Sequence, residues 1–452
     1  MPVSELAKSH GPSAWVRCGS VLQAEQQFVL RPLTMALVLW GWVSAWAIGP
    51  YPTQLPSGGQ VVAGQASLSQ TPSVLNILQS SQRAVIDWQP FNVGSAAQVN
   101  FNQPSRSSVT LNRVLDNNPS QIFGRITAPG QVYLVNPSGA YFAPSASVEV
   151  GSLIATTHNL SNEDFMTGRN TLVRHGASGS IVNEGQLRAN LGGYIALLAP
   201  EVRNNGVVIA QVGTVVLAAG DAYTLQFDGA GLLSNVLVTP ATMKALVENG
   251  NAVQAPGGLI ILSAQAASRL QGGVVNNTGS LQANGVVKDG GRILLRASDQ
   301  INHRGVIQAD AVPNSDGHGG NITLIADLNN LQSLTMVSGS LSARAGEQGG
   351  NGGFVETSAS HLHVSENAQV STAAPKGLAG EWLLDPADVN ITSSGSDSNF
   401  TPISNTYTPD SGVSNTTVSA STLIAALNSS TSVTITTTNS GTSGAGTGNI
   451  TI

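Results

Sequence analysis

The chain is poor in the residues on which most secreted domains and enzymes depend. Its 452 residues include one cysteine, and only 10% are charged and 5% aromatic. A single cysteine excludes a disulfide framework within the chain. The 19 basic residues are scattered and the formal net charge is −6, so no basic stripe suggests nucleic acid as a partner. Val, Ile, Leu and Ala, spaced by 50 glycines and many asparagines, favour strands and turns.

The position of the one cysteine, Cys18, leaves two interpretations open. It lies in a leader region, so the mature chain would contain none. A protein that must cross a second membrane unfolded is hindered by a premature cross-link. Alternatively, a continuous stacked core makes disulfides unnecessary.

The N-terminus has the pattern of an extended signal peptide over residues 1–47. Arg31 precedes an apolar run from Leu33 to Ala47, which is shorter than the roughly 20 residues of a transmembrane helix. The run ends in Ala45-Trp46-Ala47, a small-x-small cleavage signature, so we expect cleavage after Ala47 and secretion. Because the segment before the run is long, a start of translation at Met35 is the alternative.

A phrase of two glycines followed by alternating apolar residues returns along the chain. A second phrase, Asn-x-Gly, interleaves with it, and successive anchors lie 21 residues apart (Gly185 to Gly206) and 20 apart (Gly193 to Gly213). Three short strands with tight turns fill about 20 residues, which predicts an all-β parallel β-helix, a solenoid of stacked rungs. We expect inward Val, Ile and Leu, glycine and asparagine at turns that need positive φ, and asparagines that stack up the turns. Copies of the first phrase include GGYIALLA from Gly192, GGLIILSA from Gly257, GGRILLRA from Gly290 and GGNITLIA from Gly319.

Departures from the repeat predict a cap, loops and one helical insertion. The proline-interrupted segment from 48 to about 115 is expected to cap the exposed strand edges at the N-terminal end. Later spacings of about 30 residues predict loops that bulge from the rungs. The largest insertion, Asp221 to Ala255, is expected to hold a helix, ATMKALVENG from Ala241, and TLIAALN near the C-terminus is a second helical island. Inward positions expected in the cap are Val85, Phe91, Val99, Phe101, Val109 and Leu111.

Several ordered phrases, most of them in the first third and one near residue 380, together resemble one family. The chain resembles the N-terminal secretion domain, or haemagglutination activity domain, of filamentous-haemagglutinin-type two-partner secretion exoproteins of Gram-negative bacteria, from about Ile48 to Ile391. The resemblance implies a right-handed parallel β-helix with an N-terminal β cap. It also implies export by the Sec translocon and recognition in the periplasm by an outer-membrane β-barrel transporter with POTRA domains. The phrases are QRAVIDWQPFNVG, VNFNQPSRSSVTLNRV, PSQIFGRI, GQVYLVNPSGAYF and GEWLLDPADVNI.

One motif of that family maps onto Asn136, Pro137, Ser138 and Gly139. The family pattern is Asn-Pro-Asn-Gly, and Ser138 stands here in place of the second asparagine. Serine still favours a turn, so the turn is expected to survive. Two roles remain open for these four residues, a tight turn between rungs or direct contact with the transporter.

A search for catalytic, cofactor or metal chemistry yields no assignment. Asp310, Asp316 and His318 share one loop, which is best explained as an insertion between rungs. His361 and His363 lie two apart on one strand face, but no third metal ligand is evident. The other carboxylates are scattered, so we expect no cofactor, no metal site and no enzyme activity.

The resulting hypothesis is a secreted or cell-surface adhesin or haemagglutinin. Its expected segments are the signal peptide 1–47, a two-partner secretion domain 48–300, further rungs 301–390, and the Ser/Thr/Gly/Asn-rich start of another repeat region, 391–452. Cell-surface glycans or proteins are its expected targets. The last residues, GTGNITI, look like the start of a further rung, so we expect the front part of a longer exoprotein or a truncated gene. The alternatives are the front of a contact-dependent toxin and a secreted polysaccharide-active β-helix enzyme.

Overall fold

The structure is a computed structural model that describes residues 49–452, apart from 269–271, 394, 404–405, 410–415 and 438–447. The expected signal peptide, with Ala45 and Ala47, lies outside the described residues. None of the helices among the described residues combines the length and the apolar character needed to cross a bilayer.

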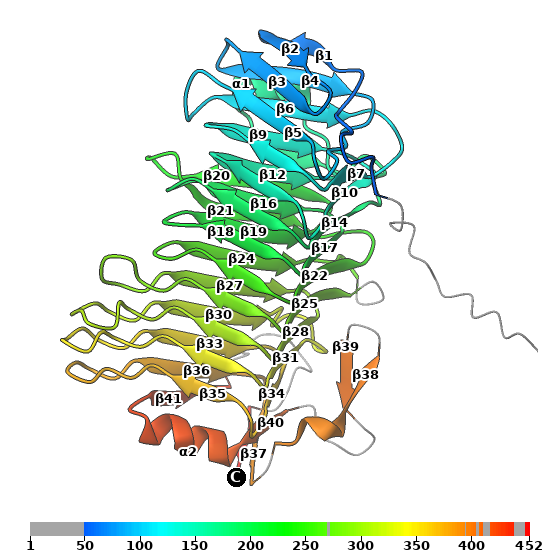
Figure 1. Cartoon of the computed structure of the whole chain (residues 1–452). Coiled ribbons are helices and arrows are strands. Elements are labelled where there is room, and N and C mark those ends of the chain that lie inside the picture. The colour runs from blue at the N-terminus through cyan, green and yellow to red at the C-terminus, as the bar shows by residue number, and fades with distance from the viewer. Residues whose placement is uncertain (1–48, 269–271, 394, 404–405, 410–415, 438–447) are drawn as a thin grey trace, which may run out of the picture. The chain divides into compact units, whose positions relative to one another are not determined.

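The described residues from 49 onward form a parallel β-helix with three long sheets, here called A, B and C (Figure 1). Each rung contributes one short strand to each sheet, so neighbours in a sheet come from successive rungs. Sheet A consists of β1 (Gln60–Ala63), β4 (Arg83–Trp88), β6 (Val109–Val114), β9 (Gln131–Val135), β12 (Ser152–Thr156), β16 (Tyr194–Leu198), β19 (Thr214–Ala219), β24 (Leu259–Ala264), β27 (Arg292–Ala297), β30 (Asn321–Ala326), β33 (Phe354–Ser358), β36 (Glu381–Asp385) and β41 (Ser432–Ile435). Sheet B consists of β2 (Ala66–Gln70), β3 (Val74–Gln79), β5 (Gln98–Asn102), β8 (Arg125–Thr127), β11 (Ser147–Val150), β15 (Gln186–Ala189), β18 (Val207–Ala210), β23 (Ala252–Gln254), β26 (Ser280–Gln282), β29 (Val306–Gln308), β32 (Ser340–Ser342) and β35 (Gln369–Ser371). Sheet C consists of β7 (Ser120–Ile122), β10 (Gly139–Phe142), β14 (Ser180–Asn183), β17 (Glu201–Asn204), β22 (Ala245–Asn249), β25 (Gly273–Asn277), β28 (Gln300–His303), β31 (Leu334–Val337), β34 (His361–Val364), β40 (Thr417–Ser419), β37 (Val389–Thr392) and β42 (Ile450–Thr451).

The elements outside these sheets are few. A three-stranded antiparallel sheet and a two-stranded hairpin lie outside the rungs, and three short helices complete the described residues. They are β13 (Thr171–Val173), β20 (Ala222–Phe227) and β21 (Leu233–Thr239), then β38 (Phe400–Ile403) and β39 (Thr406–Pro409), then α1 (Asn162–Thr167), α2 (Ala420–Asn428) and the 3₁₀ helix η1 (Asp397–Asn399).

The N-terminal cap is shorter than the sequence predicted. Among the described strands of the three long sheets, only β1 and β2 are antiparallel to their neighbours, β1 against β4 and β2 against β3, and they cover the first edges of sheets A and B. Parallel pairing already begins between β3 and β5 and between β4 and β6. Most of the segment expected to be cap therefore forms the first rungs. An antiparallel strand at each edge satisfies the edge groups that would otherwise template aggregation.

A column of glycines explains the repeated Gly-Gly phrase. At each member of the column after the first, an added Cβ would lie 1.8–2.5 Å from the carbonyl oxygen of the preceding member, so no side chain fits between the stacked backbones. The first glycine has positive φ in two of the phrases, at Gly192 (75°) and Gly257 (66°), which agrees there with the expected turn. In the later phrases the first glycine does not have positive φ, and an added Cβ at Gly290 or Gly319 would lie 2.0 Å from a carbonyl oxygen of the next rung. The second glycine is required by close packing. The column runs through Gly130, Gly151, Gly193, Gly213, Gly258, Gly291, Gly320, Gly353 and Gly380.

The expected stacking of asparagines is confirmed at the turn that follows sheet C. Side-chain amides in successive rungs donate Nδ2 to Oδ1 at 2.8 Å, and each is at most 1% exposed. This asparagine ladder satisfies buried polar groups that no water can reach. The last amide donates to Nδ1 of a buried histidine at 3.1 Å. The members are Asn183, Asn204, Asn249, Asn277 and His303.

The predicted helix in the 221–255 insertion is wrong. Residues Ala245–Asn249 form the sheet C strand β22, and the insertion before them is the antiparallel pair β20 and β21. The segment ATMKALVENG was predicted to be a helix that ends at Gly250, but Ala245, Leu246 and Val247 are buried in a strand that pairs with both neighbouring rungs. The second predicted helix, TLIAALN, is confirmed as part of α2. The described residues also include a short helix that was not predicted, α1, with an N-cap at Ser161.

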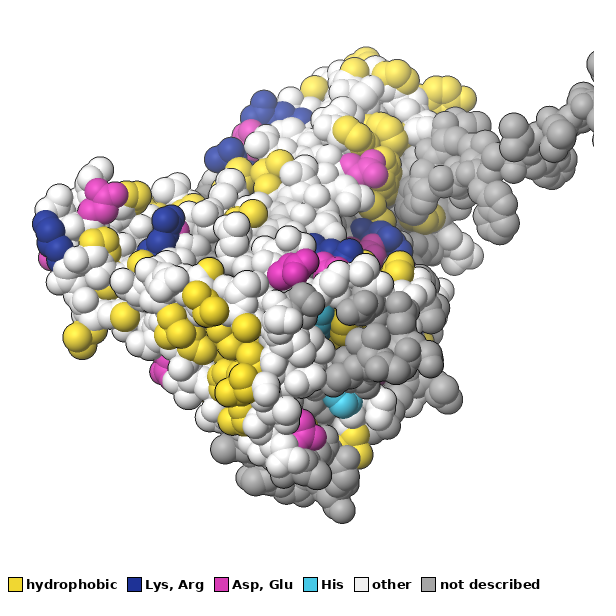
Figure 2. All heavy atoms as spheres, turned by 90° about the horizontal axis from the view of Figure 1, so that it is seen from below, with side chains coloured by type: hydrophobic (Ala, Val, Ile, Leu, Met, Phe, Trp, Pro, Cys, Tyr) yellow, Lys and Arg dark blue, Asp and Glu magenta, His cyan; other side chains and the backbone are white. Residues whose placement is uncertain are grey.

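The later rungs bulge out as expected, and the bulges are ordered. Loops between sheets B and A project from the rungs and stack on one another, as Figure 1 shows beside β27 to β36. Backbone hydrogen bonds join successive loops, for example from Val312 N to Lys288 O (2.9 Å) and from Gly346 N to Gly317 O (2.9 Å). Seen from below (Figure 2), charged side chains lie in small mixed-sign groups separated by uncharged surface.

Candidate functional site

The motif Asn136 to Gly139 forms a tight turn between β9 and β10. Asn136 is 1% exposed, and its Nδ2 donates to Asn118 O (2.9 Å) and to Ser120 Oγ (3.0 Å). Its Oδ1 accepts from Ser138 N (2.9 Å), and its backbone carbonyl accepts from Gly139 N (2.9 Å). The Asn136 amide therefore closes the turn and also ties it to the chain entering β7.

Gly139 is required at the end of this turn for two reasons. Its φ is 104°, a region that L-residues rarely adopt. An added Cβ would lie 2.4 Å from the carbonyl oxygen of Ser180 in the next rung. The turn therefore packs directly against the start of β14, and a side chain at Gly139 would push the two rungs apart.

The other two residues of the motif face outward. Pro137 is exposed and Ser138 is half-buried, whereas Asn136 and Gly139 are buried. The structure thus separates the four residues into two that shape the turn and two that form its surface. Only Pro137 and the accessible part of Ser138 are available to a partner while this fold is intact.

Four elements that lie outside the β-helix pack on the outer face of sheet A, and they are here called the cover. Helix α1 and the strands β13, β20 and β21 bury a second apolar cluster, separate from the core inside the rungs. Strands β16, β19 and β24 are therefore buried along their whole length, whereas β27 alternates between buried and accessible positions. Members of this outer cluster include Val85, Val109, Leu111, Tyr133, Phe165, Leu198, Val216, Tyr223 and Ile261.

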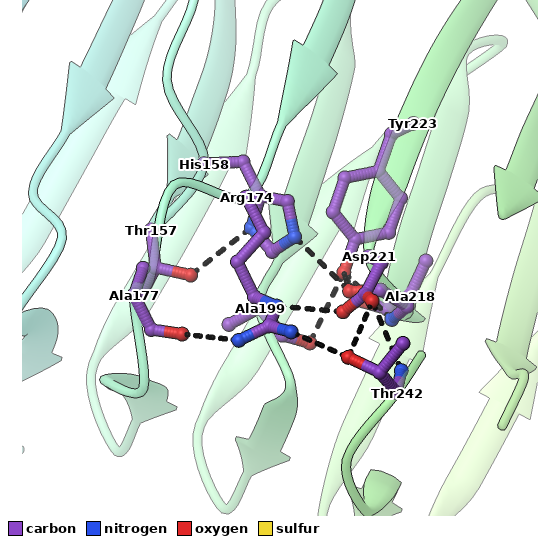
Figure 3. A network of polar contacts seen from close by, with 10 residues as sticks. Thr157, His158, Arg174, Ala177, Ala199, Ala218, Asp221, Tyr223 and Thr242 are labelled. Atoms are coloured by element: carbon purple, nitrogen blue, oxygen red, sulfur yellow. Dashed lines mark hydrogen bonds and ion pairs between the residues drawn. The ribbon is translucent and has the colours of Figure 1, made fainter. Parts of the chain in front are cut away.

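A buried polar network joins the cover to the rungs (Figure 3). The Nδ1 of His158 is hydrogen-bonded to Thr157 Oγ1 (3.1 Å), and its Nε2 is hydrogen-bonded to Gly220 O (3.0 Å). The Tyr223 hydroxyl accepts from Gly220 N (2.9 Å) and reaches Ala218 O (3.1 Å), and its ring centroid is 4.6 Å from that of His158. Burial lowers the pKa of His158 to about 4, so the imidazole is neutral at neutral pH.

An ion pair completes the network at the edge of the cover. Arg174, which follows β13, donates Nε to Asp221 Oδ1 (2.6 Å) and a second nitrogen to Thr242 Oγ1 (2.7 Å). Thr242 also donates its backbone N to Asp221 Oδ2 (2.9 Å). Burial raises the pKa of Asp221, but the hydrogen bonds from Arg174 and Thr242 outweigh it, and the net shift is downward. These bonds position β13, β20 and the insertion relative to one another, and they suit a structural role.

The cover was not predicted, although the sequence contains a signal for it. The phrases YIALLA, TVVLAA and LIILSA are almost continuously apolar, with one small hydroxyl residue in each of the last two, while the later RILLRA and NITLIA each carry two polar residues on one strand face. A strand buried on both faces has this continuous pattern. The six residues expected to be inward are all at most 2% exposed, but Val85, Val109 and Leu111 point into the outer cluster.

The acidic loop residues bind basic side chains or backbone groups. Asp310 pairs with Arg344 (2.9 Å), and Asp316 pairs with Lys288 (2.8 Å). His318 Nδ1 accepts from Asn351 N (2.9 Å). These residues hold the stacked loops together.

The two histidines of β34 lie on one face of the strand, as expected, and contact different partners. His361 Nε2 contacts Leu331 O (3.1 Å), and His363 Nε2 contacts Asp397 Oδ1 (3.1 Å). Among the described residues, no group of three or more His, Cys, Asp or Glu side chains is arranged to hold a metal ion.

Comparison with known proteins identifies the same arrangement elsewhere. A model of the TPS secretion domain matches residues 53–309. Two Haemophilus influenzae proteins, each described as a heme/hemopexin-binding protein, are 32% identical over 265 residues and 29% identical over 308 residues. These matches cover 57% and 63% of this chain but only 29% and 32% of the relatives, so the chain spans about a third of their length. The crystal structure of the HMW1 secretion domain from Haemophilus influenzae has the same fold, with a TM-score of 0.65 and 24% identity over 74% of this chain and 88% of that one.

The match to the TPS secretion domain model over residues 53–309 identifies this capped β-helix as a secretion domain. The family match covers the first part of the β-helix, from the cap through the covered rungs, and the rungs continue beyond it. The chain belongs to the TPS secretion domain family and is a two-partner secretion exoprotein. Such proteins are secreted across the outer membrane, and membership implies a cognate outer-membrane transporter. The matched proteins are exoproteins with secretion domains rather than enzymes.

Proposed function

We propose that residues 48–300 are the export domain, which a cognate β-barrel transporter recognises through its POTRA domains after Sec-dependent export. In this proposal residues 301–390 extend the shaft, and 391–452 begin a further repeat region. The exported chain then acts at the cell surface as an adhesin of the haemagglutinin type, with glycans or proteins of other cells as targets. The observation that carries the export role is the family match over residues 53–309.

The export role is tested by deletion. Removing residues 48–160 from the chain, in a host that carries the cognate transporter, should abolish secretion while synthesis continues. Undiminished export of the deletion variant would overturn the assignment. N-terminal sequencing of the secreted wild-type protein should begin at Ile48, because cleavage is proposed to follow Ala47; a different first residue would refute that site.

We further propose that two residues of the turn motif maintain the turn and that the other two contact the transporter. Asn136 and Gly139 are buried and hold the turn, so Pro137 and Ser138 are the residues proposed to contact the transporter. Each side chain lost from such a contact costs about 1 kcal/mol, and two together weaken binding by roughly tenfold or more. The double variant Pro137→Ala/Ser138→Ala should therefore bind the transporter's isolated POTRA domains more weakly and be exported less.

A matched control is present one corner further along the rung. Pro144 and Ser145 are also an exposed Pro-Ser pair, between β10 and β11. Pro144→Ala/Ser145→Ala should leave export and POTRA binding unchanged. Equal export by both double variants and the wild type would show that the motif serves only the turn. Ser138→Asn, which restores the family pattern, should export at least as well as the wild type.

The adhesive role is supported by the family alone and is tested on cells. The purified secreted chain should bind to host or bacterial cells in a saturable manner, and pretreatment of the cells with protease or glycosidase should separate protein from glycan targets. Absence of saturable binding to any cell type tried would contradict adhesion by this part of the protein.

A further inference from the structure

A polar hollow lies on the outer face of sheet C, away from the turn motif. It has a volume of about 300 Å³, at the lower end of the range for ligand pockets. Four consecutive rungs form it, through β17, β22, β25 and β28 and the turns that follow them. Its lining residues are Asn205, Glu248, Asn249, Gly250, Asn276, Thr278, Asn302, Arg304 and Tyr407.

One wall is a column of outward side chains in register. Glu248, Asn276 and Asn302 occupy equivalent positions of β22, β25 and β28. Asn302 Nδ2 donates to Asn276 Oδ1 (2.7 Å), and Asn276 Nδ2 donates to Glu248 Oε1 (3.4 Å). Glu248 is also paired with Arg203 of the preceding rung. This column therefore begins at an ion pair and ends at an amide.

The amide oxygen of Asn302, at the end of the column, lacks a hydrogen-bond donor among the described residues. Asn302 is 3% exposed, and its Oδ1 is a buried acceptor without a hydrogen-bond donor in the structure. A buried carbonyl oxygen without a partner is costly. A hydroxyl group entering the hollow would supply a donor beside Asn302.

The second wall explains why the surface is hollowed. Asn205, Gly250, Thr278 and Arg304 each follow directly after a member of the asparagine ladder, so they stack at one corner. Gly250 interrupts this stack of side chains. An added Cβ there would meet only the flexible Asn205 Oδ1 within 3 Å, and the next atom is 3.8 Å away. The lack of a side chain at Gly250 therefore leaves the surface hollow, although the neighbouring backbone would leave room for one.

The far end of the hollow is closed by a residue from much later in the chain. Tyr407 lies in β39, and Gln300 holds it through two hydrogen bonds to its backbone, at 2.7 and 2.9 Å. The Arg304 guanidinium lies over the Tyr407 ring at 4.3 Å. Among the described residues, no carboxylate forms an ion pair with Arg304.

The chemistry of this lining selects a class of ligand. Amides and the Thr278 hydroxyl each both donate and accept, which suits a ligand whose groups also do both. One aromatic ring and one cation are too few for nucleic acid, which needs a basic track along the phosphates. A single carboxylate is too few for a calcium site. We propose that this hollow binds an oligosaccharide, whose hydroxyls bond to the amide column and Asn302 while a ring lies against Tyr407.

This proposal deepens the adhesive role proposed above and rests on it, and it does not depend on recognition by the transporter. The test starts with the purified full chain on an array of defined neutral and carboxylated oligosaccharides. The best-bound oligosaccharide is then titrated in solution by calorimetry. Absence of binding to every oligosaccharide on the array would overturn the proposal while leaving the export role standing, since export is measured separately.

Two variants locate the site. Gly250→Gln fills the hollow from a position where a side chain is tolerated, and it should weaken binding at least tenfold. Tyr407→Ala removes the ring from a surface hairpin and should also weaken binding. The matched control is Gly229→Gln, at the exposed turn between β20 and β21, where an added Cβ meets nothing within 4 Å. Thermal unfolding confirms that each variant is folded. If folded Gly250→Gln and Tyr407→Ala both bind as tightly as the control, the hollow is not the site.

Discussion

Replacing one amide in the middle of the asparagine ladder should destabilise the solenoid far more than replacing a nearby surface asparagine. Asn249 is 1% exposed, accepts from Asn204 Nδ2 and donates to Asn277 Oδ1, both at 2.8 Å. Asn249→Ala removes both bonds in the interior. It also leaves the Asn277 Oδ1 without its ladder donor, and leaves the Asn204 Nδ2 with only a long contact to Ala252 O (3.4 Å).

The expected magnitude follows from these contacts. A net hydrogen bond contributes about 1 kcal/mol, and each buried polar group left unpaired costs about 1–3 kcal/mol more. Asn249→Ala should therefore lower the free energy of unfolding by about 3–5 kcal/mol. The matched control is Asn251→Ala, two residues further on. Asn251 is exposed and donates one bond, to Asn205 O (3.0 Å), so about 0.5–1 kcal/mol is expected.

Two buried tryptophans provide the assay. Trp88 in β4 and Trp382 in β36 are the only tryptophans after residue 47, and they lie on either side of β22 in the stack. Urea unfolding followed by tryptophan fluorescence, with a Trp382→Phe background to isolate Trp88, reports both ends of the solenoid. A difference of less than about 1 kcal/mol between the Asn249 and Asn251 variants would refute the ladder as a stabilising element.

Three further predictions follow from other positions. Burial lowers the pKa of His303 to about 4, below the unfolded value of 6.5, so its neutral form stabilises the fold fully above pH 6.5. About 3 kcal/mol of stability should be lost as the pH falls from 6.5 to 4. His303→Asn continues the ladder with an amide and should make the loss over this pH range about 3 kcal/mol smaller in urea unfolding. The loss due to His158, whose pKa is also lowered to about 4, should remain, and an unchanged profile would contradict the prediction. Gly213→Ala places a Cβ 1.8 Å from Gly193 O and should cost about 3 kcal/mol or more, and a loss below about 1 kcal/mol would mean that the rungs separate easily. Tyr223→Phe leaves the buried Gly220 N without its acceptor and should lower the free energy of unfolding by about 2–3 kcal/mol by urea denaturation, whereas an unchanged value would show that water replaces the hydroxyl.

The sequence predicted the residues of the turn motif but not the role of each one. The four residues were identified from their order alone, and serine was expected to preserve the turn. Whether they shape the turn or meet a partner depends on which of them are accessible. Gly139 is buried because β10 packs against β14, whose paired residue Ser180 lies 41 residues later. Asn136 is buried by its bonds to Asn118 and Ser120 in the preceding rung, while Pro137 stays exposed.

The hollow beside Arg304 could not be found from the sequence. Its lining comes from five separate segments between Asn205 and Tyr407. A long insertion separates β17 from β22, so the register that aligns Glu248 with Asn276 and Asn302 is visible only after the strands are paired. Tyr407 belongs to a hairpin in the Ser/Thr/Gly/Asn-rich segment 391–452. The sequence predicted only the start of a further repeat region there, and no contact with the earlier rungs.

The sequence by itself determined the repeat, and therefore the stack of parallel strands, because only glycine fits where backbones nearly touch and only asparagine extends a buried amide ladder. It also determined the family, through ordered phrases in the first rungs. The tertiary structure decided which face of each strand is buried. Val85, Val109 and Leu111 look like inward residues, yet they support an outer cover, because α1 and β20 return to pack on sheet A. It also turned ATMKALVENG into a strand, since pairing on both sides of β22 outweighs a local preference for helix.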